Sequence, residues 1–155
     1  MLKTLVLVDV DGTIADIEDY LGFLAVKPKN WKAFHASIPN HKPIISVLNI
    51  VNLMGQLPEI YDVNFLTARQ EVCRPQTQGW LEAQAKFPVR LFMRKTNDFR
   101  KNYLVKEEII LEEFLTPEYH TVYDELLSFE DDPATVKMFR ELGFRCLDVG
   151  YKKIE

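Results

Sequence analysis

The sequence is poor in cysteine and has no apolar run long enough to cross a membrane. Its two cysteines, Cys73 and Cys146, lie far apart and belong to no CxxC or Cys/His cluster, which argues against a disulfide scaffold or a zinc site and for a reducing cytoplasm. No apolar run approaches the roughly 18 residues that a membrane helix needs. The apolar stretch 4–8 is short and runs directly into Asp9, so we expect no signal peptide.

The chain also lacks a strong charge of either sign, internal repeats and low-complexity segments. Its net charge is -4 over 155 residues, and such mild acidity argues against a generic nucleic-acid coat protein while leaving room for a local basic patch. Hydrophobic residues make up 47% and charged residues 27% of the chain, as in a globular protein. This length and composition predict one domain over residues 1–155 with one hydrophobic core.

Short apolar runs alternate with longer helical patterns along most of the chain. We expect strands at residues 5–8, 63–66, 89–93, 126–129 and 144–149, and helices at residues 44–54, 74–86, 103–115 and 132–142. This alternation predicts an α/β fold in which helices cover both faces of a parallel sheet of about five strands. If the second and third strands lie on one side of the first, and the fourth and fifth on the other, the strand order is 3-2-1-4-5.

Residues 16–43 interrupt this alternation. The segment contains several aromatic residues and several helix breakers, and we expect it to form a small helical cap inserted after the first strand. Because it directly follows the most reactive-looking residues of the chain, a lid over a ligand site and an ordinary long connection are both open interpretations.

The first expected strand ends in the sequence DVDGT, residues 9–13. Two carboxylates, Asp9 and Asp11, stand two residues apart, and Gly12 lets the backbone turn sharply after them. Two such acids beside a buried strand repel one another unless a cation neutralises them. One carboxylate would then serve as a nucleophile and the other as a proton donor, with a metal ion neutralising both.

Polar and basic residues follow the second and third expected strands. Thr67 and the neighbouring backbone amides would hold a phosphoryl oxygen, and Arg69 suits a further phosphate contact. Residues 94–106 then gather five basic side chains in a mildly acidic chain. Such a run is often only a solvated surface, but beside the acidic motifs it favours an anionic substrate.

Three consecutive acids, Glu130, Asp131 and Asp132, follow the fourth expected strand. This arrangement is costly unless a cation or solvent relieves the repulsion. In the order 3-2-1-4-5 the switch point falls between the first and fourth strands, where an open α/β sheet binds ligands. The pattern therefore predicts that Asp131 and Asp132 lie beside Asp9 and Asp11.

Taken in order, DVDGT, LTAR, a lysine and DD resemble the haloacid dehalogenase-like phosphohydrolase superfamily over the whole chain. The resemblance implies a Rossmann-like three-layer sandwich, Mg²⁺ and an aspartyl-phosphate intermediate. It assigns the nucleophile to Asp9, the general acid/base to Asp11, and the phosphoryl-binding hydroxyl and lysine to Thr67 and Lys106. The implied metal ligands are Asp9, Asp11, Asp131 and Asp132, and the implied substrate-binding residues are Gly12, Thr13, Ala68, Arg69 and Arg94.

The stretch LFMRKTNDFRKNYLVKEEI, residues 91–109, is similar to the 3′-phosphatase domain of bacteriophage-type polynucleotide kinase/phosphatase. In that family the equivalents of Arg69 and Arg94 belong to the phosphatase site. The chain has no GxxxxGK[ST] motif, so we expect no kinase domain in it. Residues 16–43 and extra residues around 119–125 depart from the pattern of that family.

The sequence thus predicts a Mg²⁺-dependent phosphatase that removes 3′-phosphates from nucleic-acid ends. A phosphatase of free nucleotides or other small phosphate esters stays open as the alternative, as does a catalytically silent binding module. A receiver-type signalling domain also clusters acids, a threonine and a lysine around Mg²⁺, but its phosphate-accepting aspartate follows the third strand. Here that strand ends in Met93 and Arg94, which argues against this class.

Overall fold

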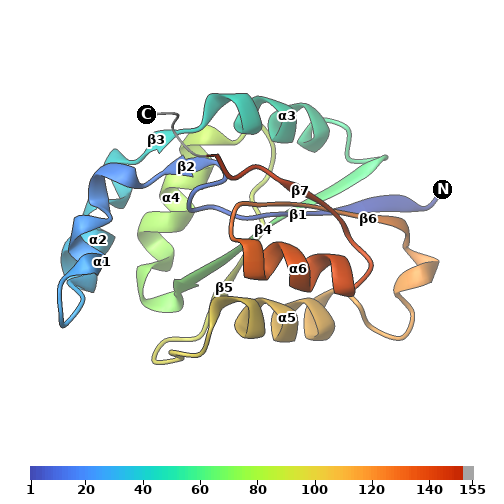
Figure 1. The fold of residues 1–155 in the computed structure, drawn as a ribbon. Coiled ribbons are helices and arrows are strands. Elements are labelled where there is room, and N and C mark those ends of the chain that lie inside the picture. Colours follow the sequence, from blue (N-terminus) through green and yellow to red (C-terminus); the bar gives the residue numbers. More distant parts are fainter. Residues whose placement is uncertain (152–155) are drawn as a thin grey trace.

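In the computed structural model, which describes residues 1–151, the main sheet consists of five parallel strands (Figure 1). The strands are β1 (Lys3–Val8), β4 (Tyr61–Gln70), β5 (Leu91–Arg94), β6 (Tyr123–Glu130) and β7 (Arg145–Asp148). Their order across the sheet is β5-β4-β1-β6-β7, which confirms the predicted order 3-2-1-4-5. The first strand of the chain is therefore the central strand of the sheet.

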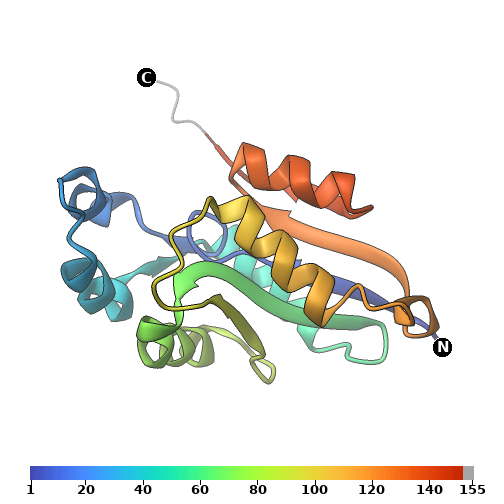
Figure 2. The same cartoon turned by 90° about the horizontal axis from the view of Figure 1, so that it is seen from below.

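Helices cover both faces of this sheet, as Figure 2 shows from below. They are α3 (Ile45–Gly55) and α4 (Arg74–Gln84, preceded by the 3-10 turn Glu71–Cys73) on one face, and α5 (Asn102–Glu113) and α6 (Pro133–Glu141) on the other. In β1, Val6 and Val8 pack in the core under α3 and α4, whereas Leu5 and Leu7 pack in the core under α5 and α6. Because both faces of β1 are buried, its sequence is continuously aliphatic. The predicted three-layer sandwich is confirmed.

Strand β4 is longer than the sequence predicts. The apolar pattern supports a strand over 63–66, whereas β4 extends to Gln70 and includes Thr67 and Arg69. The register of its pairing with β5 shifts between Thr67 and Gln70, an irregularity that often re-aims side chains beside functional sites. The polar residues of this part of the chain therefore belong to the sheet, where hydrophobic patterning does not detect them.

Residues 16–43, which we call the insertion, project from one end of the sheet (Figure 1). They form α1 (Gly22–Ala25), α2 (Trp31–Ser37) and the 3-10 turns Glu18–Tyr20 and Ile38–Asn40. Asn30 caps α2, because its side-chain oxygen accepts a hydrogen bond from the Ala33 N–H at 3.1 Å. At the base, β2 (Ala15–Asp16) pairs antiparallel with β3 (Lys42–Pro43). The two ends of the insertion therefore lie side by side.

The two cysteines are buried on opposite faces of the sheet. Cys73 lies in the core under α3 and α4, and Cys146 lies in the core under α5 and α6; both are free thiols. A final 3-10 turn, Tyr119–Thr121, leads into β6, which begins at Tyr123 and so earlier than the predicted residue 126. None of the helices within residues 1–151 has the length and apolarity that a membrane span requires.

Candidate active site

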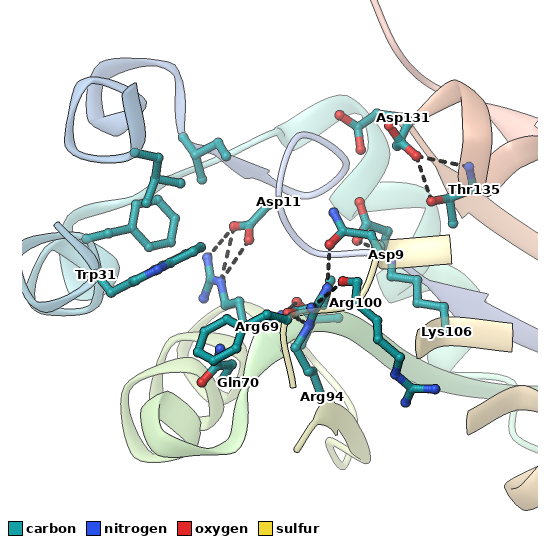
Figure 3. Close-up of a pocket in the computed structure, with 18 of the residues that line it drawn as sticks. Asp9, Asp11, Trp31, Arg69, Gln70, Arg94, Arg100, Lys106, Asp131 and Thr135 are labelled. Carbon is teal, nitrogen blue, oxygen red and sulfur yellow. Dashed lines mark hydrogen bonds and ion pairs between the residues drawn. The ribbon is translucent and has the colours of Figure 1, made fainter. Parts of the chain in front are cut away.

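A cavity of about 610 Å³ opens beside the insertion at the carboxyl ends of β1, β4 and β6 (Figure 3). Its lining includes most of the predicted site residues, namely Asp9, Asp11, Thr67, Ala68, Arg69, Arg94, Lys106, Asp131 and Asp132. The topology explains this convergence, because parallel strands present their carboxyl ends at one edge of the sheet. Side chains that are far apart in the sequence thus share a single cavity.

Asp9 stands at the end of β1 in a buried, hydrogen-bonded group. Its Oδ1 accepts a hydrogen bond from Lys106 Nζ at 2.7 Å, and its Oδ2 accepts one from Thr13 Oγ1 at 2.9 Å. Lys106 Nζ also donates to Glu130 Oε2 at 2.7 Å. One buried ammonium therefore ties the carboxylates of β1 and β6 together. The sequence did not assign Glu130 to the site, and its only signal was its place as the first of three acids after a strand.

The neighbouring charges set the protonation of these groups. Burial by itself raises the pKa of Asp9, but the Lys106 ammonium and the hydrogen bonds outweigh burial and hold that pKa below its usual value. Burial lowers the pKa of Lys106, yet its two carboxylate partners raise it overall. Burial and the charge of Asp9 raise the pKa of Glu130 to about 7, because two acids share one ammonium. Asp9 is therefore ionised at neutral pH, as a carboxylate nucleophile must be.

The Asp131 carboxylate packs directly against Gly12 and lies near Asp9 and Glu130. The φ angle of Gly12 is +78°, and a Cβ atom there would lie 2.1 Å from Asp131 Oδ2, so a side chain at position 12 would be strained and would displace the carboxylate. The Thr13 hydroxyl, which is fully buried, lies 3.4 Å from Asp131 Oδ1 and hydrogen-bonds Asp9 as well. Burial and the negative charge of Asp9 raise the pKa of Asp131 to about 8.

The three carboxylates form a cluster that is able to bind a metal ion. Asp9, Glu130 and Asp131 each offer an oxygen atom, and these atoms lie within 4.8 Å of one another. A divalent cation among these acids would favour the ionised form of all three, and carboxylate oxygens are the ligands that Mg²⁺ prefers. The chemistry of the donor set therefore fits a hard divalent cation.

Asp132 lines the cavity but its carboxylate caps α6. Its Oδ2 accepts hydrogen bonds from the Thr135 N–H at 2.9 Å and from Thr135 Oγ1 at 2.7 Å. The N–H groups of Asp131 and Asp132 both donate to Glu130 Oε1, at 3.1 and 3.2 Å. These bonds fix the start of α6 next to the end of β6, and so they hold the acidic cluster in place.

Asp11 points to Arg69, away from the Lys106 group (Figure 3). Arg69 Nε donates to both Asp11 oxygens, at 3.2 and 3.0 Å, and Arg69 Nη2 donates to Asp11 Oδ1 at 2.5 Å. The Arg69 side chain is almost completely buried, whereas the Asp11 side chain is 25% exposed to the cavity. A bidentate contact of this kind fixes the plane of the Asp11 carboxylate.

Arg69 is itself positioned by His41, a residue that the sequence did not single out. Arg69 Nη2 donates to His41 Nδ1 at 3.1 Å, so the proton of the His41 ring is on Nε2. This Nε2–H donates to Ser37 Oγ at 2.9 Å, and the Ser37 hydroxyl in turn donates to the Phe34 carbonyl at 2.7 Å. Burial and the Arg69 charge lower the pKa of His41 to about 4, so its ring is neutral at physiological pH. Hydrogen bonds thus connect the insertion to Asp11.

Arg94 organises the loop between β5 and α5. Its Nε donates to the Ala68 carbonyl at 2.8 Å, and its Nη1 donates to the carbonyls of Asp98 and Arg100 at 3.0 and 2.7 Å. Its Nη2 donates to Asn102 Oδ1 at 2.5 Å. Only 6% of Arg94 is exposed. The guanidinium therefore both lines the cavity and closes the loop.

The other predicted residues of this region lie in varied environments. Thr67 is buried on β4, and its Oγ1 accepts a hydrogen bond from the Arg69 N–H at 3.2 Å. Arg100 forms ion pairs of 2.7 Å with both Asp98 and Glu108 at the surface. The basic run 94–106 therefore does not act as one uniform patch, because its members have different partners.

Replacing Arg94 by alanine is expected to lower the free energy of unfolding by about 2 kcal/mol or more. Three carbonyls and one side-chain oxygen would lose a charged donor in a partly buried setting. Urea unfolding followed by circular dichroism measures this loss. The matched control is Arg145→Ala on the exposed side of β7, with an expected change within about 0.5 kcal/mol. An unchanged unfolding midpoint for Arg94→Ala would contradict the structural role.

Comparison with known proteins agrees with this geometry. The family model of the polynucleotide kinase PNKP phosphatase domain matches residues 3–153. Among solved structures, a chain of the Pnkp1/Rnl/Hen1 complex is similar to 99% of this chain, with a TM-score of 0.74 and 26% sequence identity. This chain spans 48% of that chain, about half its length. A search of curated proteins by sequence found no match.

Two solved structures of lower identity share the fold. A D,D-heptose 1.7-bisphosphate phosphatase from B. bronchiseptica matches with a TM-score of 0.60 and 15% identity, over 92% of this chain and 78% of its own. A putative beta-phosphoglucomutase from Thermotoga maritima matches with a TM-score of 0.60 and 12% identity, over 98% of this chain and 88% of its own. Both have the same sheet-and-helix arrangement.

The strand order, the ionised Asp9 at the end of the central strand and the matched family together define a phosphatase domain of the haloacid dehalogenase type. The family match covers nearly the whole chain. The chain belongs to the family of the polynucleotide kinase PNKP phosphatase domain, and the resemblance drawn from its motifs is confirmed.

Proposed function

We propose that the protein is a Mg²⁺-dependent phosphatase that removes 3′-phosphates from nucleic-acid ends through an aspartyl-phosphate intermediate. The observation that carries the proposal is the ionised Asp9 carboxylate, held by Lys106 at the floor of a cavity. The family of the chain supports a polynucleotide substrate, because it is the phosphatase domain of a polynucleotide kinase. This substrate is supported as well by the similar structures that belong to an RNA repair complex.

In the first step, an Asp9 oxygen attacks phosphorus as the ester bond to the 3′-oxygen breaks. Asp11, once it carries a proton, would give that proton to the departing 3′-oxygen. Lys106 and Thr67 would hold the phosphoryl oxygens during the transfer. In the second step, water attacks phosphorus and passes a proton to Asp11, which releases inorganic phosphate and regenerates Asp9.

The metal ion belongs to the acidic cluster in this proposal. Asp9 and Asp131, beside Glu130, would hold Mg²⁺, which when bound shields the charge between Asp9 and the phosphoryl oxygens. The predicted ligands Asp11 and Asp132 line the same cavity, and their role at the metal stays a prediction. Thr13 and Gly12 would hold the metal ligands in position, because Thr13 hydrogen-bonds Asp9 and the Asp131 carboxylate packs against Gly12.

A substrate panel tests the function. We expect kcat/KM for a 3′-phosphorylated oligonucleotide to exceed that for a 3′-mononucleotide, for glycerol phosphate and for a 5′-phosphorylated oligonucleotide by at least about tenfold, a factor that corresponds to about 1.4 kcal/mol. Phosphate release measured at equal Mg²⁺ concentration gives the comparison. Chelation of the metal should stop turnover, and added Mg²⁺ should restore it.

The same panel decides between the proposed function and its alternative. Equal or higher kcat/KM for mononucleotides or glycerol phosphate would favour a phosphatase of small phosphate esters. Full activity in chelator would contradict the metal assignment while leaving the covalent mechanism standing.

A further inference from the structure

The wall of the cavity that the insertion provides is aromatic, and the proposed phosphate chemistry does not use it. Trp31, Phe34 and His35 of α2 line the cavity together with Phe99 of the loop between β5 and α5. Trp31 is 40% exposed and Phe99 is 72% exposed. Large exposed rings beside a polar site are more useful for ligand recognition than for packing of the core.

Trp31 is exposed and yet supported from below. Its ring meets the ring of Phe34 edge-on, with the centroids 6.3 Å apart, and lies 6.0 Å from the ring of His35. Phe34 is 2% exposed and packs 5.5 Å from the ring of His41. The small core of the insertion thus holds Trp31 in place, so its open surface is a preorganised platform.

The platform and the proposed chemistry lie at opposite ends of the cavity. Figure 3 shows Trp31 on one side and Asp9 with Lys106 on the other, with Arg69 between them. The volume of about 610 Å³ falls within the range of about 300–1,000 Å³ of sites for drug-sized ligands. A phosphoryl group at Asp9 therefore leaves room between Arg69 and Trp31 for the adjoining part of the substrate.

Positive charge accompanies the aromatic surface. Lys29 Nζ lies 5.6 Å from the centroid of the Trp31 ring, and Lys29 and Arg100 both line the cavity. Proteins bind single nucleic-acid strands with this combination, because bases stack on aromatic rings while cations pair with the backbone. A sugar phosphate or a phosphorylated amino acid has no base to place on Trp31.

We infer that Trp31 is the stacking platform for the base of the terminal nucleotide that carries the 3′-phosphate; this inference rests on the proposed function. The base lies on the Trp31 ring, its 3′-phosphate reaches Asp9, and the next backbone phosphate lies toward Lys29. The insertion then recognises the nucleoside, while the residues at the carboxyl ends of β1, β4 and β6 bind the phosphate.

The test compares two 3′-phosphorylated oligonucleotides that differ only in the terminal nucleotide, which has its base in one and is abasic in the other. Removal of the base is expected to raise KM about tenfold or more. Trp31→Ala should raise KM for the base-containing end by a similar factor and cause no further rise for the abasic end, because both changes remove the same contact. Trp31→Phe should keep most of the affinity, because it keeps a ring.

Phe23→Ala is the matched control, since Phe23 is an aromatic residue of α1 in the same insertion with a similar exposure of 37%. It should leave KM for both ends unchanged. Equal KM for the two ends with the wild-type protein, or additive effects of Trp31→Ala and base removal, would overturn the inference and leave the proposed function standing. Hydrolysis of glycerol phosphate without hydrolysis of either oligonucleotide would overturn both.

Discussion

We expect Asp9→Asn to lower kcat by at least about 1,000-fold, equivalent to about 4 kcal/mol of barrier. An amide lacks the negative charge with which Asp9 would attack phosphorus. Its oxygen is still able to accept the hydrogen bond from Lys106, so the fold should persist. Single-turnover phosphate release measures the chemical step, and a melting curve measures the fold.

The control for this experiment is Asp124→Asn, which changes an exposed aspartate on β6 in the same manner. Its kcat should stay within about twofold of the wild-type value. If Asp9→Asn retained activity within tenfold of the wild type, the covalent mechanism would be refuted.

Lys106→Met is expected to be equally severe, and it should also destabilise the protein. Methionine keeps the approximate length of the side chain but leaves Asp9 and Glu130 buried without their shared ammonium. Removing one partner of a buried ion pair costs about 3–5 kcal/mol. The loss of the positive charge next to the phosphoryl group should lower kcat by about 1,000-fold or more. Chemical denaturation and phosphate release measure the two effects.

A double variant separates catalysis from stability at this position. Lys106→Met with Glu130→Gln leaves one fewer uncompensated carboxylate in the buried group, so part of the lost stability should return. Activity should not return, because Asp9 and the phosphoryl oxygens still lack the ammonium. Lys137→Met on α6, where 78% of the side chain is exposed, should change neither quantity. Recovery of activity in the double variant would show that Lys106 acts only on stability.

The fold could be predicted from the sequence because its strands and helices follow hydrophobic patterning. The aliphatic run of β1 predicts a strand buried on both faces, and the spacing of the apolar runs predicts the helices between the strands. The extension of β4 through Arg69 was not predicted, since its last residues are polar and are held by pairing with β5 across an irregular register. Patterning detects apolar burial and does not detect such contacts.

The sequence predicts those residues of the candidate site that belong to motifs. It does not predict the residues that join the site only through tertiary contacts. Asp9 and Lys106 come together because α5 packs on the sheet against β4, the neighbour of β1. Nothing in the local sequence indicates that His41 accepts a hydrogen bond from Arg69, or that Arg94 bonds to three carbonyls. Trp31 and its aromatic neighbours were visible in the sequence as an unusual segment, but only the structure places them in the cavity.

The pairing of β2 with β3 has a consequence for the evolution of this chain. Because Ala15 lies opposite Pro43 and Asp16 opposite Lys42, the backbone enters and leaves the insertion at nearly the same point. A loop closed in this way tolerates changes of length, since each doubling costs only about 0.6 kcal/mol of closure entropy. Residues 17–30 are therefore the part of the insertion where length and shape are free to change. Phe34, Ser37 and His41 lie beyond them and hold Arg69 and Asp11 at the catalytic edge of the sheet.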